Sequence, residues 1–285
     1  MTTKNLFGLI KTKLSECSID NSENEAYIIL EKALNLSRTE LILRFNEEID
    51  DSAVNFALSS ADKRVTGIPV QYCIGEWDFY GETYKVGKGV LIPRPETEEL
   101  CEIVIDKLKR IENPTVIDLC SGSGCIGLTI KKNVPSSKVF MVEKSREALE
   151  YLIQNASRIC PDEFVSIVNG DVLKPDSFDE TFDKADLIVS NPPYIITSEL
   201  DSLQREVQFE PEMALDGGED GYLFYRVLCA EWPRYLKKGG IMAFECGENQ
   251  AQYICSLFNK DLFDIEIRKD FNGTERFVIG RMKLK

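Results

Sequence analysis

The residues best suited to chemistry in this sequence are four in a row, Asn191-Pro192-Pro193-Tyr194. They follow an apolar run, Leu187-Ile188-Val189-Ser190, which is typical of a buried parallel strand. Two successive prolines cannot continue a strand or lie inside a helix, so the chain must turn at the strand's carboxyl end. The turn offers a carboxamide, a backbone carbonyl and an aromatic ring, which together suit the binding of a planar –NH2 group. A proline-rich surface turn is the alternative, and these four residues alone do not decide between the two.

A second candidate is the glycine-rich turn Asp118–Gly127, which follows an apolar strand and opens a helix. Glycines there let the backbone approach a ligand closely, and the helix N-terminus faces that ligand. The pattern is not G-x-G-x-x-G, because Cys120 stands where the first glycine would be. The turn also lacks the basic residue that a pyrophosphate would favour. By itself it is weak evidence for a binding site.

Two acidic residues follow the next two strands. Glu143 ends one strand, where a carboxylate can accept hydrogen bonds from ribose hydroxyls. Asp171 follows the other strand, where it would accept a hydrogen bond from an adenine amino group or cap a turn. The alternative for Glu143 is a solvated acid. Because all four groups fall at the carboxyl ends of successive strands, we expect them to converge on one binding site.

The elements that must position these groups are short apolar strands alternating with helices. This alternation predicts an α/β fold with a Rossmann-like, doubly wound and mostly parallel seven-stranded sheet. Helices are expected between the strands, including residues 147–156 and 222–236. The last two strands are joined by Asn272-Gly273, a hairpin-like turn. The expected strands are residues 116–120, 139–142, 165–168, 187–190, 241–246, 262–268 and 276–281.

Three parts of the chain differ in their pattern. Residues 1–74 carry apolar side chains at helical spacing and no catalytic motif, so we expect a small all-α domain that docks the substrate. Residues 75–92 alternate apolar with polar side chains and glycines, which predicts a β-hairpin linker. Residues 93–285 form the α/β domain, and its first helix is opened by the acidic, proline-rich stretch 93–99.

Composition excludes several classes of function. The chain has no histidine, which removes Ser-His-Asp and Cys-His nucleophilic schemes and any histidine base. Its nine cysteines form no C-x-x-C pair, so we expect no metal site and reduced thiols in the cytoplasm. A net charge of −14 opposes direct nucleic-acid binding and is compatible with a basic protein partner. No segment approaches the ~20 apolar residues that cross a membrane.

In their order along the chain, the four groups resemble class I S-adenosylmethionine-dependent methyltransferases. The Asn-Pro-Pro-Tyr form resembles members that act on adenine N6, cytosine N4 or the glutamine side-chain amide. Residues 67–81, 91–98 and 209–221 are similar to peptide chain release factor glutamine N5-methyltransferases, the HemK or PrmC family. The similarity runs from about residue 65 to the C-terminus, and the helical N-terminal domain fits by size and class only. Cys120 departs from a glycine that is common in the family.

The resemblance implies methyl transfer from S-adenosyl-L-methionine, leaving S-adenosyl-L-homocysteine, to the glutamine of the Gly-Gly-Gln motif of release factors. It implies a catalytic set of Asn191, Pro192 and Tyr194. The implied cofactor-binding set is Asp118, Cys120, Ser121, Gly122, Ser123, Gly124, Glu143, Lys144, Asp171, Val172 and Asn191. The implied substrate-binding set is Asn191, Pro192, Pro193, Tyr194, Arg94, Glu96 and Thr97. For Glu96 and Thr97, plain helix capping is an equal alternative.

The mechanism must overcome the poor nucleophilicity of an amide nitrogen, whose lone pair is delocalised into the carbonyl. The hypothesis is that Asn191 Oδ1 and the Pro192 carbonyl each accept one N–H of the substrate, while Tyr194 stacks on the amide plane. No general base is then needed before attack. Alternatives are a methyltransferase for ribosomal-protein glutamine, a DNA adenine N6-methyltransferase and a catalytically silent binding module. The DNA alternative would need a basic groove or a target-recognition domain, and the sequence predicts neither.

Overall fold

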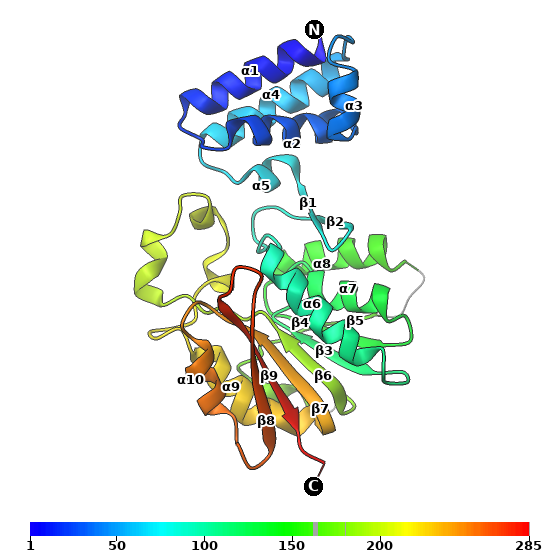
Figure 1. Ribbon diagram of the computed structural model, residues 1–285, viewed down its shortest axis with the longest axis vertical. Coiled ribbons are helices and arrows are strands. Elements are labelled where there is room, and N and C mark those ends of the chain that lie inside the picture. The colour runs from blue at the N-terminus through cyan, green and yellow to red at the C-terminus, as the bar shows by residue number, and fades with distance from the viewer. Residues whose placement is uncertain (162–164, 180, 285) are drawn as a thin grey trace. The chain divides into compact units, whose positions relative to one another are not determined.

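The computed structural model describes residues 1–161, 165–179 and 181–284. The chain divides into two compact units, shown in Figure 1. The first unit comprises Met1–Glu76 together with the short segment Gln204–Phe209. The second comprises Trp77–Leu203 and Glu210–Lys285. The chain therefore leaves the second unit for six residues and returns to it.

The first unit is helical, as the sequence predicts. Its core is formed by apolar residues that recur every four positions in α1, namely Leu6, Ile10 and Leu14, packed against α2 and α4. Asp50 caps α4 by accepting a hydrogen bond from the Ala53 amide at 2.9 Å. The helices are α1 Thr3–Glu16, α2 Ser22–Leu34, α3 Arg38–Leu43, α4 Asp51–Val65 and α5 Val70–Ile74.

A buried cation holds the segment Gln204–Phe209 in the first unit. The Arg64 side chain is only 5% exposed; its Nε donates to Glu25 Oε2 at 2.6 Å and its Nη2 to Glu206 Oε1 at 2.7 Å. The neighbouring Arg205 donates to the Thr66 carbonyl. One guanidinium thus links two helices to a segment that lies about 140 positions further along the chain.

The second unit is built on a seven-stranded sheet in the order β5-β4-β3-β6-β7-β9-β8. The first five strands in this order are parallel, and β9 is antiparallel to both of its neighbours. Because the strand order reverses between β3 and β6, a crevice is expected at their carboxyl ends. The strands are β3 Thr115–Leu119, β4 Lys138–Glu143, β5 Val165–Asn169, β6 Ala185–Ser190, β7 Leu236–Glu245, β8 Phe263–Lys269 and β9 Glu275–Met282.

Helices cover both faces of this sheet (Figure 1). One apolar layer joins the sheet to α6, α7 and α8, and a second joins the opposite face to α9 and α10. A short hairpin of β1 Glu76–Phe79 and β2 Glu82–Lys85 precedes these helices in the chain. The helices are α6 Pro95–Leu108, α7 Cys125–Asn133, α8 Arg146–Ile159, α9 Leu223–Glu231 and α10 Ala251–Leu257. The predicted doubly wound α/β architecture is therefore confirmed.

Two boundaries in the α/β domain differ from those expected by several residues. The helix expected over residues 222–236 ends at Glu231 and continues as a 3-10 turn, Trp232–Tyr235, because Pro233 has no N–H to extend the α-helix. The strand expected from Ile241 begins at Leu236, which pairs with Ala185 across an irregularity in the register. Pairing with a neighbouring strand there outweighs the low strand propensity of Gly239 and Gly240.

Replacement of Arg64 tests the ion pairs of the first unit. We expect Arg64→Ala to lower the free energy of unfolding by about 3 kcal/mol, near the low end for breaking a buried pair because Glu206 is partly exposed. Denaturant unfolding of the full chain measures the effect. The adjacent Lys63→Ala is the control, since Lys63 is exposed and its loss should change stability by less than about 0.5 kcal/mol. Equal stability of the two variants would contradict this assignment.

Candidate active site

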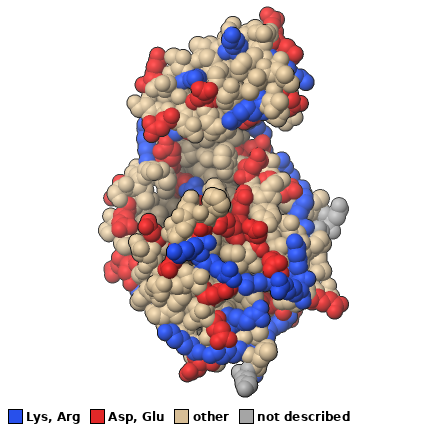
Figure 2. Space-filling view, in the orientation of Figure 1, with Lys and Arg blue, Asp and Glu red and all other residues tan. Residues whose placement is uncertain are grey.

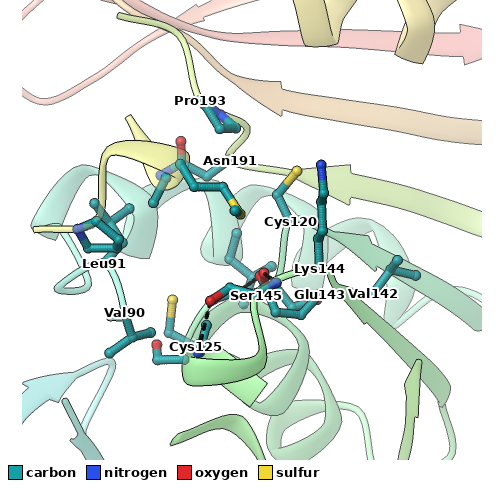
Figure 3. Close-up of a pocket in the computed structure, with 18 of the residues that line it drawn as sticks. Val90, Leu91, Cys120, Cys125, Val142, Glu143, Lys144, Ser145, Asn191 and Pro193 are labelled. Carbon is teal, nitrogen blue, oxygen red and sulfur yellow. Dashed lines mark hydrogen bonds between the residues drawn. The ribbon is translucent and has the colours of Figure 1, made fainter. Parts of the chain in front are cut away.

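A cleft opens in the second unit at the carboxyl ends of the parallel strands (Figure 3). It holds about 940 Å³ of empty space, counting its open mouth, which lies in the ~300–1,000 Å³ range of small-molecule sites. Residues from well-separated parts of the chain line it. Those predicted from the sequence are Arg94, Thr97, Cys120, Ser121, Gly122, Ser123, Glu143, Lys144, Asp171, Val172, Asn191 and Pro193.

The glycine-rich turn forms one wall of the cleft. Cys120, Gly122 and Gly124 all have positive φ, at 59°, 55° and 83°, which lets the chain turn sharply from β3 into α7. A Cβ atom at Gly124 would come within 2.3 Å of Leu152 Cδ1, so this glycine also permits close packing against α8. Gly124 itself lies outside the lining, where it is the N-cap residue of α7.

Asp118 lies beneath this turn and is fully buried rather than part of the lining. Its Oδ2 accepts a hydrogen bond from the Gly127 amide at 3.0 Å, which braces the first turn of α7. Its Oδ1 has no hydrogen-bond partner among the described residues, and neither has the buried hydroxyl of Ser123. Burial raises the pKa of Asp118 to about 7, although the Gly127 amide opposes this. The turn therefore carries unsatisfied polar atoms at its base, which is unusual for a site without a ligand.

Asn155 of α8 positions the same turn from the other side. This fully buried side chain donates to the Ser123 carbonyl at 2.9 Å and to the Lys85 carbonyl at 3.1 Å. It also accepts from the Lys85 amide at 2.7 Å. One carboxamide therefore ties β2 to the glycine-rich turn. Nothing in the local sequence marks Asn155, because both of its partners are more than thirty positions away.

Glu143 at the end of β4 has both carboxylate oxygens fixed by backbone amides. Oε2 accepts from Gly122 at 2.8 Å and Oε1 from Ser145 at 2.7 Å. Burial raises its pKa, and the two amides oppose that rise. Each carboxylate oxygen has two lone pairs, so the group can still accept one further hydrogen bond at each. Glu143 is thus held rigidly with acceptor capacity toward the cleft.

Asp171 after β5 has two partners in the structure. Its Oδ1 accepts from the Leu173 amide at 3.0 Å, which forms an Asx turn, and its Oδ2 pairs with Lys144 Nζ at 3.0 Å. Burial raises the pKa of Asp171, but these two contacts outweigh it, and the pKa is lowered overall. The turn-capping interpretation describes these contacts, and binding of an adenine amino group stays a prediction.

The Asn-Pro-Pro-Tyr turn is fixed by several backbone contacts. At its start, Ser190 Oγ donates to the Leu119 carbonyl at 2.7 Å, which joins β6 to β3. At its end, the Tyr194 carbonyl accepts from Gln250 Nε2 at 2.9 Å. Gly217 packs on the turn so closely that a Cβ atom there would lie 2.7 Å from Tyr194 Cα. The glycine at position 217 therefore has a steric reason.

Besides Asp118 and Gly124, three of the predicted site residues lie outside the lining of the cleft. They are Pro192, Tyr194 and Glu96. The Tyr194 ring is half-buried against the layer that α9 and α10 form with the sheet. Burial raises the pKa of its hydroxyl to about 12, so Tyr194 stays protonated at neutral pH. The predicted roles of these three residues, including stacking by Tyr194, remain predictions.

Asn191 is hydrogen-bonded to the buried side chain of Thr97 and, through it, is linked to the buried side chain of Glu245. Its Nδ2 donates to Thr97 Oγ1 at 3.2 Å, and Thr97 Oγ1 donates to Glu245 Oε2 at 2.7 Å. Thr97 and Glu245 are each 2% exposed. The hydroxyl of Thr97 therefore does not cap α6, whose N-cap residue is Arg94 without a side-chain cap. Thr97 is among the site residues predicted from the sequence, and Glu245 is not.

The remaining wall comes from the segment after the turn. The buried carboxylate of Glu210 accepts from the Ile92 amide at 2.9 Å and pairs with Arg94. This anchors the residues that follow, and Pro211, Met213 and Ala214 line the cleft. Sequence reasoning did not select these residues as site candidates. The sequence signal for this wall is the stretch Phe209-Glu210-Pro211-Glu212, which belongs to the family resemblance.

The sheet order and the cleft at its carboxyl edge define a doubly wound α/β protein with a ligand site at the point where the strand order reverses. A crystal structure of a methyltransferase from Pyrococcus furiosus shares the fold, with a TM-score of 0.51 and 20% identity over 72% of this chain and 90% of that one. The family model of the PrmC N-terminal domain matches residues 7–75. The family model of the methyltransferase small domain matches residues 97–213.

Curated relatives define the family further. The release factor glutamine methyltransferase of Thermodesulfovibrio yellowstonii is 38% identical over 259 residues, which cover 90% of this chain and 91% of that protein. The one of Aquifex aeolicus is 33% identical over 282 residues, covering 98% and 99%. This chain therefore belongs to the family of release factor glutamine methyltransferases. The resemblance inferred from the motifs is confirmed.

The left-handed backbone at Cys120 gives a stability prediction. Alanine and glycine both remove the thiol, but only glycine adopts positive φ without strain. We expect Cys120→Gly to be more stable than Cys120→Ala by about 1 kcal/mol. At Cys101, inside α6, the order should reverse by a similar amount, because glycine is unfavourable in a helix. Thermal unfolding of the four variants measures both differences, and the same order at both positions would refute the assignment.

Proposed function

We propose that this enzyme transfers a methyl group from S-adenosyl-L-methionine to the side-chain amide nitrogen of the glutamine in the Gly-Gly-Gln motif of peptide chain release factors. The single observation that carries the proposal is the location of Asn191. Its carboxamide lines the same cleft as the glycine-rich turn and Glu143. A methyl donor and an amide acceptor would therefore meet in one cavity. A release factor substrate implies that the enzyme works in the cytoplasm.

The residues of the cleft fit S-adenosyl-L-methionine. The Glu143 carboxylate, fixed by two amides, has acceptor capacity for a pair of ribose hydroxyls. The buried Asp118 Oδ1 and Ser123 Oγ atoms lack partners among the described residues, and they lie at the base of the turn that would approach the ligand. The N-terminus of α7 has no side-chain cap, and the positive end of the helix dipole there favours a carboxylate. When bound, S-adenosyl-L-methionine would supply an electrophilic methyl group.

Asn191 and Pro192 would activate the acceptor by accepting its two N–H groups. Hydrogen bonds to both protons draw electron density toward the amide nitrogen and turn its lone pair toward the methyl group. Positioning of this kind contributes up to ~7–11 kcal/mol to lowering a barrier. The proton on nitrogen becomes acidic only after methylation, so no base is needed before attack. This agrees with a chain that contains no histidine.

The charges of the second unit support a protein substrate over DNA. On the face shown in Figure 2, basic side chains are interspersed with acidic ones. Several of the basic groups are held in ion pairs, such as Lys107 with Glu266 at 3.3 Å and Arg276 with Asp270 at 3.3 Å. The chain as a whole carries a net charge of −14, which opposes binding along a nucleic-acid backbone. Among the described residues, no helix is long and apolar enough to cross a lipid bilayer.

A methyl-transfer assay with labelled S-adenosyl-L-methionine tests the proposal. Three acceptors are compared: a purified release factor, its Gly-Gly-Gln→Gly-Gly-Ala variant, and duplex DNA. We expect label on the wild-type factor alone. Label on DNA would replace the proposal with base methylation. No label on any acceptor, with the methyl donor still bound, would point to a ribosomal protein or a silent binding module.

Asn191→Ala separates chemistry from binding. Because Asn191 Oδ1 would contact the acceptor amide, we expect kcat to fall by at least ~100-fold, as for loss of one polar group that stabilises a transition state. The dissociation constant of S-adenosyl-L-methionine, measured by calorimetry, should change by less than about threefold. Asn133→Ala is the control, since Asn133 is exposed at the opposite end of α7. Near-normal turnover by Asn191→Ala would remove this residue from the mechanism.

A further inference from the structure

The side chains of Glu245, Thr97 and Asn191 form a hydrogen-bonded chain that runs from the protein core to the cleft. Glu245 ends β7, Thr97 lies in the first turn of α6, and Asn191 follows β6. Asn191 and Thr97 line the cleft, whereas Glu245 lies behind them and is 2% exposed. The proposed chemistry does not use Glu245, yet a buried acid at this place is costly to retain. Its contacts indicate what it does.

The chain of hydrogen bonds has one direction. An ionised carboxylate only accepts hydrogen bonds, so Glu245 Oε2 requires Thr97 to donate its single hydroxyl proton, at 2.7 Å. The Thr97 oxygen then has only lone pairs left for a neighbour. It can therefore accept from Asn191 Nδ2, at 3.2 Å, and cannot donate to Asn191 Oδ1. The Oδ1 atom is left as the end of the carboxamide that faces away from Thr97.

We propose that Glu245, acting through Thr97, fixes the orientation of the Asn191 carboxamide so that Oδ1 faces the acceptor amide. Glu245 and Thr97 are thus positioning residues, and Asn191 is the residue that touches the substrate. This inference rests on the proposed function, in which Asn191 accepts an N–H of the glutamine side chain.

Orientation matters because the two ends of a carboxamide are almost equal in size. Packing alone cannot distinguish Oδ1 from Nδ2, and only hydrogen bonds do. In the reversed orientation Asn191 would present an –NH2 group to the –NH2 group of the substrate. Two donors would then face each other, and the acceptor amide would lose the partner that aligns its lone pair. The acid therefore acts on turnover without touching either ligand.

The groups around Glu245 shift its pKa in opposite directions. Burial raises its pKa to about 7, against the Thr97 hydrogen bond and the positive charge of Arg276 on β9. Glu96 on α6 adds to the rise, and the Asn191 carboxamide opposes it. Arg276 is itself held by Asp270 at 3.3 Å and by the Cys246 carbonyl at 3.0 Å. Protonated Glu245 can donate as well as accept, which removes the single direction of the chain, so kcat should rise with pH through about 7.

Four substitutions in the full chain test the inference. Glu245→Gln keeps the shape but supplies a donor, and Thr97→Val keeps the shape but removes the hydroxyl. Thr97→Ser retains the hydroxyl and is the conservative rescue. Glu248→Gln is the matched control, because Glu248 lies three positions away and is exposed. For each variant, kcat toward a release factor, the dissociation constant of S-adenosyl-L-methionine and the unfolding temperature are measured.

We expect kcat to fall roughly tenfold or more in Glu245→Gln and Thr97→Val, as misplacement of a reactive group predicts. Thr97→Ser and Glu248→Gln should stay within about threefold of wild type, and binding of the methyl donor should be unchanged in all four. The rise of kcat near pH 7 should be weakened in Glu245→Gln. Asp118 also has a pKa of about 7, but it is unchanged in every variant, so the difference between profiles reports on Glu245.

Each contrary outcome has its own meaning. If the wild-type enzyme does not label the release factor while binding the methyl donor, the proposed function fails. If it does label the factor and Glu245→Gln keeps the wild-type kcat and pH profile, the inference on Glu245 is overturned alone. The inference is also overturned if Thr97→Ser is as slow as Thr97→Val. Loss of donor binding and thermal stability in parallel with kcat would show a merely structural role.

Discussion

The pairing of β3 with β6 is the constraint on which the rest of the site depends. These strands are distant in the sequence but parallel neighbours in the sheet, with Leu119 opposite Ser190. The Ser190 hydroxyl stabilises this register because it donates a hydrogen bond to the Leu119 carbonyl at 2.7 Å. The strand after each of them leads outward in opposite directions, so the turns that follow β3 and β6 face one crevice. A change of register by one residue would turn Ser190 to the other face and separate the two turns.

Sequence patterns predicted the elements and the turns well, because both depend on local chemistry. Runs of apolar residues fix the strands, and Pro192-Pro193 forces a turn wherever the chain folds. The contacts that orient the site could not be predicted in the same way. Thr97 and Glu245 are separated by 148 positions and meet only because α6 packs beside β7. For Thr97, the capping preference of threonine was an equal alternative, and tertiary structure decided against it.

Two deeply buried acids of the second unit lower the stability of the fold near neutral pH, and they orient groups beside the cleft. Asp118 and Glu245 each have a pKa raised to about 7, so the folded chain binds more protons than the unfolded chain between about pH 4.5 and pH 7. Their contribution to the free energy of unfolding therefore falls as the pH rises through this window. Both acids brace neighbouring groups at the cleft, one through Gly127 and the other through Thr97. Perturbed pKa values of this kind cluster at functional sites.

The route of the chain through Gln204–Phe209 has a consequence for how family members recombine. These six residues belong to the helical unit, although they are encoded in the middle of the methyltransferase part. A fragment that ends at Glu76 would leave Arg64 with Glu25 alone and expose the surface on which Arg205 and Glu206 lie. The helical unit is therefore not a detachable module. A chimaera between two relatives would have to exchange both segments together, and residues 64 and 206 should change in concert during evolution.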